Sequence, residues 1–309
     1  MRRRNENPGC ERSPVGSVVA VGRFDGVHLG HQHLLAEARR LARELRIPAV
    51  AYTFPPTGEA LLPLPAKRAL LGKFCDRVVI RPWGEIRDLS PEEFVRRELV
   101  GALGAKTVVV GPNHRFGHQA RGDVELLREL GKRFSLRVRV VPPRLDERGE
   151  VISSRRIRGL VRAGEVEEAG RLLGRPPVLI GERVPGAGLA SKLGFPTLNL
   201  APWPGQLRPR PGVYIAWAHW PGGGGPGLFY LGSRPTFPHL LPSCEVHLFS
   251  PPKPEPQGLL EVALLSRLRP DMKFPGSQAL HRQIEEDLAR ARELLASFSP
   301  PAPLLVNGN

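Results

Sequence analysis

The chain has 309 residues, 41% of them hydrophobic, and a net charge of +15. At about 150 residues per domain, this length and apolar content fit a globular protein with two domains and a core in each. No apolar run approaches the roughly 20 residues of a membrane helix, and the basic opening leads into polar residues rather than a signal-peptide core. We therefore expect a soluble, cytoplasmic protein.

The cysteines and the charge narrow the class further. Cys10, Cys75 and Cys244 are far apart and form no CxxC pair, so neither a disulfide framework nor a zinc site is expected. A strongly positive chain favours anionic partners, which include nucleic acids, acidic membranes and polyphosphate ligands. Charge alone does not choose among them. The basic residues are dispersed and few aromatics lie between them, so we predict no nucleic-acid and no membrane partner.

From residue 17 to about 173, short β-branched runs alternate with helical periodicity. Residues 17–24 are typical of a buried strand, and the leucines of 31–45 lie on one helical stripe. Further strands are expected at 49–54, 77–80, 106–111 and 136–141. This alternation predicts an α/β domain with a parallel sheet and helices on both faces.

After Pro177 the pattern changes to strands separated by Gly/Pro-rich turns. Strands are expected at 178–184, 212–220, 227–232, 245–249 and 260–265, which predicts a small antiparallel β-barrel. Residues 277–298 should form a C-terminal helix that packs on this barrel, with Ser277 as its N-cap. We place the domains at 16–174 and 176–298, and expect disorder in residues 1–15 and 300–309.

A glycine-containing turn, residues 25–31, follows the first strand and leads into a helix. Backbone N–H groups and the helix dipole converge on an anion at such a place. His28 and His31 could each donate to one phosphate and stabilise the charge that develops on phosphorus during in-line attack. A chance pair of histidines and a metal pair are the alternatives. With no third ligand nearby in the sequence, a zinc site is not expected.

A second motif, residues 152–158, also begins a helix. Ser153 or Ser154 is expected to cap it, so that hydroxyls, free N–H groups and Arg158 gather at one helix start. Such an arrangement is suited to holding pyrophosphate. For this motif alone, a plain N-cap with exposed arginines remains an equal alternative.

The string Gly-Arg-Phe-Asp-Gly-Val-His-Leu-Gly-His at 22–31 resembles the nucleotide-binding signature of the bifunctional riboflavin kinase/FAD synthetase family. The resemblance continues through 53–54, 111–117, 122–123 and 152–158, and covers residues 17–298. It implies a Rossmann-like nucleotidyltransferase fold in which the FMN phosphate attacks the α-phosphorus of ATP and pyrophosphate leaves. Phe54 and Asn113 are implied near the flavin or the nucleotide. The implied ATP-binding residues are Gly22, Phe24, Asp25, Gly26, His28, Gly30, His31, Ser153, Ser154 and Arg158.

Residues 193–200 resemble the GFPTxN signature of the family's riboflavin kinase domain, a Greek-key barrel. In an extended segment Thr197 and Asn199 point to one side and offer two neutral oxygens to a hard cation. A Pro-centred surface turn would be the better interpretation of these residues alone. Family landmarks that follow in order, at 211–214, 232–237, 245–248 and 268–274, favour the kinase.

The resemblance implies Mg²⁺ together with ATP at this second site. Gly188, Lys192, Thr197 and Asn199 are the implied ATP and magnesium residues. Glu245 is implied as the general base, which takes the proton of the terminal ribityl hydroxyl while the γ-phosphoryl group moves. An exposed strand-edge glutamate is the alternative role for this residue.

The chain departs from the family in both halves. Arg23, His114 and Arg155 replace the residues usual in the first half. In the second half, residues 189–191 are Leu-Ala-Ser where the family carries Arg-Gly-Arg, Tyr230 replaces Asn, and an Asp-Leu-Tyr-Gly segment is missing from 250–258.

Three functional hypotheses follow. The first is an enzyme that binds riboflavin, FMN, ATP and FAD and catalyses both steps. The second is a monofunctional FMN adenylyltransferase with an impaired kinase module, and the third is a nucleic-acid-binding protein on a nucleotidyltransferase scaffold. The sequence does not reveal the oligomeric state, the reversibility of either step or the redox preference for the flavin.

The altered loop at 189–191 generates a prediction. A charge-assisted hydrogen bond contributes roughly 1.5–3 kcal/mol, so a loop without arginine should bind ATP about ten-fold more weakly. Lys192 is the nearest substitute. Lys192→Ala should raise the Michaelis constant for ATP in riboflavin phosphorylation, Ser191→Arg should lower it, and FAD synthesis from FMN should not change. Steady-state kinetics check this; an unchanged ATP dependence in both variants contradicts it.

Overall fold

The chain forms two compact units, which we describe separately. The structure, a computed structural model, describes residues 16–186, 193–232, 243–253 and 255–306. The first unit holds residues 16–23, 33–55 and 72–143; the second holds 24–32, 56–71 and the described residues from 144 onward.

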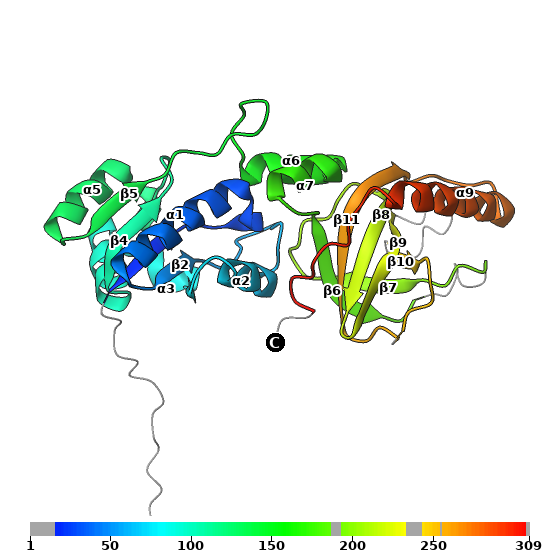
Figure 1. Ribbon diagram of the computed structural model, residues 1–309, viewed down its shortest axis with the longest axis horizontal. Helices are drawn as coiled ribbons and strands as arrows, with labels where there is room; N and C mark the ends of the chain where they lie inside the picture. The colour runs from blue at the N-terminus through cyan, green and yellow to red at the C-terminus, as the bar shows by residue number, and fades with distance from the viewer. Residues whose placement is uncertain (1–15, 187–192, 233–242, 254, 307–309) are drawn as a thin grey trace, which may run out of the picture. The chain divides into compact units, whose positions relative to one another are not determined.

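The first unit is built on a five-stranded parallel sheet with strand order β3-β2-β1-β4-β5 (Figure 1). Its strands are β1 (Ser17–Val21), β2 (Ala49–Thr53), β3 (Arg77–Ile80), β4 (Ala105–Val110) and β5 (Arg137–Val140). Every residue of β1 and β2 is buried, as the apolar runs require when helices cover both faces of a parallel sheet. The predicted α/β fold and its five strands are confirmed.

Helices complete this unit. They are α1 (Leu29–Leu45), α3 (Trp83–Ile86), α4 (Pro91–Glu93), the π-helix η2 (Phe94–Ala102), the 3₁₀-helix η3 (His118–Ala120) and α5 (Val124–Arg133). Residues 29–32 of α1 belong to the second unit. The Asp123 side chain caps α5 by accepting from the Leu126 N–H at 3.0 Å. Packing against β1 and β4 gives the unit its core.

The second unit contains a closed six-stranded antiparallel barrel with strand order β10-β7-β6-β11-β8-β9. Its strands are β6 (Val178–Val184), β7 (Leu198–Pro202), β8 (Gly212–Trp220), β9 (Gly223–Gly232), β10 (Ser243–Leu248) and β11 (Leu259–Pro270). β8, β9 and β10 pair consecutively, and β11 returns to pair with β8. This is the expected Greek key. The sequence patterns missed β7, which is only five residues long and ends in proline.

Four short helical elements precede the barrel in the same unit. They are η1 (Asp25–Val27), α2 (Leu64–Gly72), α6 (Ser154–Ala163) and α7 (Val166–Leu173). Glu167 on α7 accepts hydrogen bonds from the Ser266 hydroxyl at 2.5 Å and from the backbone N–H of Arg267 at 3.2 Å. These bonds attach α7 to β11.

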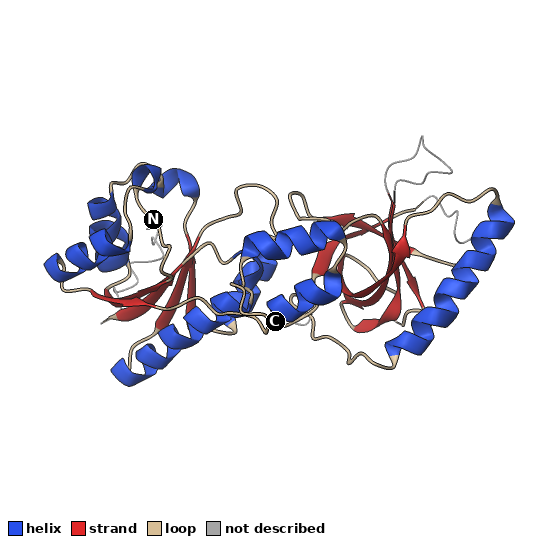
Figure 2. Cartoon of the chain, turned by 90° about the horizontal axis from the view of Figure 1, so that it is seen from above, coloured by secondary structure: helices blue, strands red, loops and turns tan. Residues whose placement is uncertain are grey.

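The helix α9 (Ser277–Leu295) runs along the outside of the barrel (Figure 2). Its Leu288 and Ala291 pack against Val213 and Ile215 of β8. The expected Ser277 cap is wrong: the N-cap is Gly276, with no side-chain cap bond, and Ser277 is already the first helical residue. None of the described helices is long and apolar enough to cross a membrane.

The C-terminal segment is ordered, contrary to our expectation for residues 300–306. The carboxylate of Glu261, which is 1% exposed, accepts backbone N–H groups of residues 304, 305 and 306. Three donors compensate the desolvation of a buried carboxylate, a contact between positions some 43 residues apart that no local pattern reveals. The other expectation of disorder, for residues 1–15, lies outside the described residues, as do 307–309.

A buried ion pair fastens α9 to β11. Both carboxylate oxygens of Asp287 accept from Nε of Arg269, at 2.9 and 2.8 Å, and Asp287 is 5% exposed. Asp287→Asn leaves a largely buried guanidinium without its counter-charge and should lower the free energy of unfolding by about 2–3 kcal/mol. Glu59→Gln, which breaks the exposed pair with Arg162, should change it by less than about 1 kcal/mol. Urea unfolding measures both; equal effects would contradict the prediction.

Candidate active sites

The turn after β1 has an unusual backbone. Phe24, Gly26 and Val27 all have positive φ, at 49°, 77° and 43°. A left-handed conformation at a non-glycine residue costs about 1–3 kcal/mol and persists only where the surroundings impose it. At Gly26 a Cβ would also lie 2.6 Å from the side chain of Leu61. The turn therefore has one conformation, held by its packing.

This turn presents two stacked histidines. The rings of His28 and His31 lie 3.6 Å apart between centroids, and the edge of Phe24 meets the His31 ring. The backbone N–H of His31 donates to Nδ1 of His28 at 3.3 Å. Because Nδ1 accepts, the neutral His28 ring carries its proton on Nε2, which is then a hydrogen-bond donor.

Both rings are neutral at pH 7. Burial lowers the pKa of His28 to about 4, with a further contribution from the charge of Arg175. Burial, then the neighbouring His28 and then Lys67, hold the pKa of His31 well below its usual value. An anion at this turn would meet neutral N–H donors rather than imidazolium cations.

Asp25 joins this turn to the second motif. Its backbone carbonyl accepts from the Ser154 hydroxyl at 2.9 Å, and its carboxylate accepts from Nη1 of Arg158 at 2.5 Å. The other carboxylate oxygen accepts the N–H of Leu61 at 2.8 Å. The structure thus brings together the two motifs, whose role in nucleotide binding stays a prediction.

The start of α6 divides its polar residues between two tasks. Ser153 is the N-cap and accepts from the backbone N–H of Arg156. The Arg156 side chain pairs with Asp146 at 2.6 Å and Glu150 at 3.0 Å. It therefore links the start of α6 to the short hairpin 145–151 that precedes this helix. Ser154 is left to bind Asp25, as described above. Two other predicted ATP-binding residues lie nearby in the sequence. Gly22 follows β1 and its backbone N–H donates to the carbonyl of Tyr52, and Gly30 lies in the first turn of α1.

The two predicted flavin residues, Phe54 and Asn113, belong to the first unit. Phe54 follows β2 and meets the rings of Tyr52 and Trp83 edge to face, at 5.5 and 5.8 Å between centroids. The Trp83 residue is 43% exposed, which gives this aromatic group an accessible edge. Asn113 is exposed in the turn after β4.

The second candidate site lies on strands β7 and β10. The Thr197 hydroxyl donates to Oε2 of Glu245 at 2.9 Å, and the Ser243 hydroxyl donates to Oε1. Asn199 is the cross-strand partner of Glu245. The backbone of Gly186 passes so close to the Asn199 amide that a Cβ there would overlap it. Glu245 is the third residue of its strand rather than the first.

These residues fit a magnesium ion that arrives with ATP. The Thr197 hydroxyl donates its hydrogen bond to Glu245, so the lone pairs of Oγ1 remain available to a cation. Among the described residues no group of three or more His, Cys, Asp or Glu side chains could hold a metal. Mg²⁺ commonly binds through one or two protein oxygens, water and substrate phosphates, so no larger acidic group is needed. The predicted Gly188 and Lys192 lie outside the described residues.

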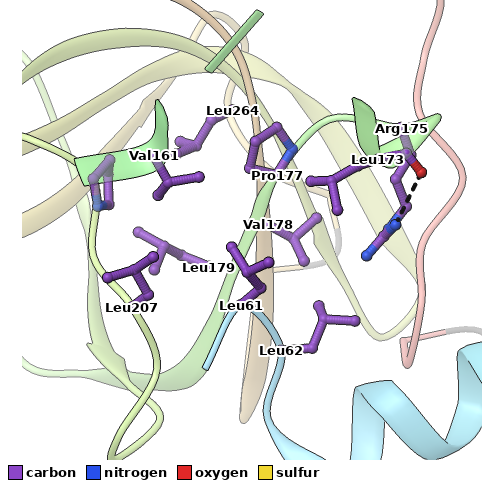
Figure 3. Close-up of a pocket in the computed structure, with 11 residues that line it drawn as sticks. Leu61, Leu62, Val161, Leu173, Arg175, Pro177, Val178, Leu179, Leu207 and Leu264 are labelled. Carbon is purple, nitrogen blue, oxygen red and sulfur yellow. Dashed lines mark hydrogen bonds between the residues drawn. The ribbon is translucent and has the colours of Figure 1, made fainter. Parts of the chain in front are cut away.

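An apolar cavity in the second unit is not a substrate site. It is lined by leucines including Leu61, Leu179 and Leu207, with Arg175 at its rim (Figure 3). Its volume of about 10 Å³ accommodates about one water molecule. A flavin or a nucleotide is far larger.

Sequence patterns missed two cations beside the histidines. Lys67, on α2, is 2% exposed, and Arg175 lies between α7 and β6. Each influences a histidine electrostatically. The only sequence signal was a charged residue in an otherwise apolar stretch, which is equally typical of a surface position.

A parallel-sheet unit, a histidine turn at a helix start and a barrel with a hydroxyl–carboxylate cluster together define a two-part nucleotide-dependent transferase. Residues 10–156 match the family described as FAD synthetase, and residues 173–295 match riboflavin kinase. The chain belongs to the bifunctional riboflavin kinase/FMN adenylyltransferase family.

Relatives of that name cover nearly the whole chain. The Pseudomonas fluorescens protein is 34% identical, over 91% of this chain and 94% of its own. The Bacillus subtilis protein is 30% identical, over 89% and 91%. A Streptococcus pneumoniae crystal structure, described as a macrolide-efflux protein, is similar with a TM-score of 0.80 and 29% identity, over 92% of this chain and 95% of its own.

The low pKa of His28 predicts how stability depends on pH. Below pH 6.5 the unfolded chain protonates this ring, whereas the folded chain stays neutral until about pH 4. The free energy of unfolding should therefore fall as pH drops from 7 to 5, by about 2 kcal/mol from this group. His28→Asn, which keeps an acceptor for the His31 N–H, should lose less over that interval.

Urea unfolding at both pH values measures the difference. His33→Asn, at an exposed position of α1, is the matched control and should keep the parental pH dependence. If the free energy of unfolding falls equally in the His28 and His33 variants between pH 7 and pH 5, burial of His28 does not control this pH dependence.

Proposed function

We propose that the protein phosphorylates riboflavin to FMN with residues 176–298 and adenylylates FMN to FAD with residues 16–174. The observation that carries the proposal is the junction at Asp25, where the His28 turn and the start of α6 meet. Two helix N-termini there offer backbone donors to a polyphosphate. Because both families match the chain, a monofunctional adenylyltransferase and a nucleic-acid-binding protein are not favoured.

In the adenylyl transfer, a phosphate oxygen of FMN attacks the α-phosphorus of ATP and the bond to pyrophosphate breaks. His28 and His31 donate N–H groups to the phosphate oxygens, where negative charge increases in the transition state. Ser154 and Arg158 steady the departing pyrophosphate. Arg158 pairs with Asp25, so a bound anion would compete with this ion pair. Phe54 and Asn113 are proposed to contact the flavin or the nucleotide.

In the phosphorylation, the terminal ribityl hydroxyl of riboflavin attacks the γ-phosphorus of ATP and ADP leaves. Glu245 accepts the hydroxyl proton. The Thr197 and Ser243 hydroxyls fix the orientation of its carboxylate. Thr197 and Asn199 would hold Mg²⁺, which neutralises phosphate charge when bound, and Gly188 and Lys192 are proposed to contact ATP. Neither reaction needs a nucleic acid or a membrane, and we place the enzyme in the cytoplasm.

The test is a double dissociation of the two activities. His28→Asn keeps the acceptor near Nδ1 but removes the Nε2 donor, and should slow FAD formation from FMN about 10²–10³-fold. His28→Gln places an amide N–H near Nε2 and should lose less. Glu245→Gln cannot accept the proton and should slow FMN formation about 10²–10⁴-fold. Chromatography of riboflavin, FMN and FAD after incubation with Mg²⁺ and ATP measures both steps.

Each variant serves as the control for the other. His28→Asn should form FMN at the parental rate, and Glu245→Gln should adenylylate supplied FMN at the parental rate. Equal loss of both activities in one variant would indicate a folding defect or a shared site. If the parental protein forms FAD only from supplied FMN, the kinase assignment is wrong; if it forms neither product, the proposed function is wrong.

A further inference from the structure

A partly buried arginine outside both motifs contacts the histidine turn. Arg175 follows α7, and its Nη2 donates to the carbonyl of Gly26 at 2.8 Å. Its Nη1 donates to the carbonyl of Leu173 at 3.4 Å (Figure 3). Its Nε is buried and has no hydrogen-bond partner among the described residues. Gln32 also links the histidine turn to the end of α7, because its Nε2 donates to the carbonyls of Val27 and Leu173 at 2.9 and 3.0 Å.

The charge of this guanidinium is the second feature of the site. Within the part of the chain that the structure describes, Arg175 pairs with no carboxylate. Burial lowers its pKa to about 10, so it stays positive at neutral pH and is close enough to His28 to lower the pKa of that ring. An unneutralised buried charge opposes folding, and a chain that needed only packing here would be served by an apolar residue. A bound polyphosphate would supply the missing negative charge.

We propose that Arg175 is a positioning residue for adenylyl transfer, which fixes the turn that carries His28 through the Gly26 carbonyl and favours nucleotide phosphates at that turn through its charge. The inference rests on the proposed function. It assigns a task in the first reaction to the segment that leads into the kinase barrel. A purely structural role for Arg175 predicts a different result, because removal of the side chain would then destabilise the fold and reduce both activities together.

The experiment compares Arg175→Met, Arg175→Lys and the control Arg171→Met, whose arginine lies exposed on α7 and pairs with Glu168. Arg175→Met should lower kcat/KM for FAD formation about ten-fold or more, chiefly through the KM for ATP. Its riboflavin phosphorylation and urea midpoint should not fall. Arg175→Lys keeps the charge and should recover part of the affinity for ATP. Arg171→Met should behave like the parental protein.

A second readout does not depend on turnover. Histidine-ring NMR should show the His28 signal responding to ATP at about ten-fold higher concentration in Arg175→Met than in the parental protein. The pKa of His28 should rise in Arg175→Met and stay unchanged in Arg171→Met. A parental protein that makes no FAD would refute the proposed function, and the NMR titration then decides the role of Arg175 separately.

Three results would overturn the inference. The first is an Arg175→Met variant with parental FAD synthesis and a parental ATP response at His28. The second is a loss of both activities in parallel with a lower urea midpoint, which would make Arg175 structural. The third is a lysine variant no better than the methionine variant, which would show that its charge has no part in nucleotide binding.

Discussion

The arrangement of the first site depends on one residue, Asp25. Its carboxylate accepts hydrogen bonds from the N–H of Leu61 and the guanidinium of Arg158, and its backbone carbonyl accepts from the hydroxyl of Ser154, so it joins two segments that are distant in sequence. Each bond alone is ordinary, but together they fix the start of α6 against the turn that carries the histidines. The positive φ values of that turn persist because these contacts, and the packing at Gly26, leave no other conformation.

The electrostatics of the site follow from this packing. Burial keeps His28 and His31 neutral, so they can donate hydrogen bonds without adding net charge. Positive charge comes instead from side chains around them, Lys67 and Arg175. In the proposed adenylyl transfer, such fixed donors with cations nearby would stabilise the developing negative charge without having to reorganise.

The sequence predicted what depends on local pattern. The five parallel strands follow from β-branched runs, and the start of α6 follows from its serine cap. The contact between the two motifs joins positions 129 residues apart, and the helix starts alone do not reveal it. The sequence missed β7, whose five residues end in proline, and the docking of residues 304–306 on Glu261. It also missed Arg175. These depend on contacts between distant positions: the guanidinium of Arg175 reaches a carbonyl 149 residues earlier. The periodicity of a sequence does not predict which charged side chain will contact which backbone oxygen in the folded chain.

The same contacts explain why the His28 turn belongs to one compact unit with the barrel. Ala60, the neighbour of the residue that donates to Asp25, exchanges backbone hydrogen bonds with Gly205 and Leu207 at 3.0 and 2.8 Å. The side chain of Gln206 in turn accepts from the N–H of Ile180 on β6 at 3.0 Å. These hydrogen bonds, together with the short backbone segments 60–61 and 205–207, therefore connect the first barrel strand to Asp25. A chain ending at residue 174 would keep both nucleotide motifs but lose the support that this path and the segment after α7 give to the turn, so the first site is a product of both halves of the sequence.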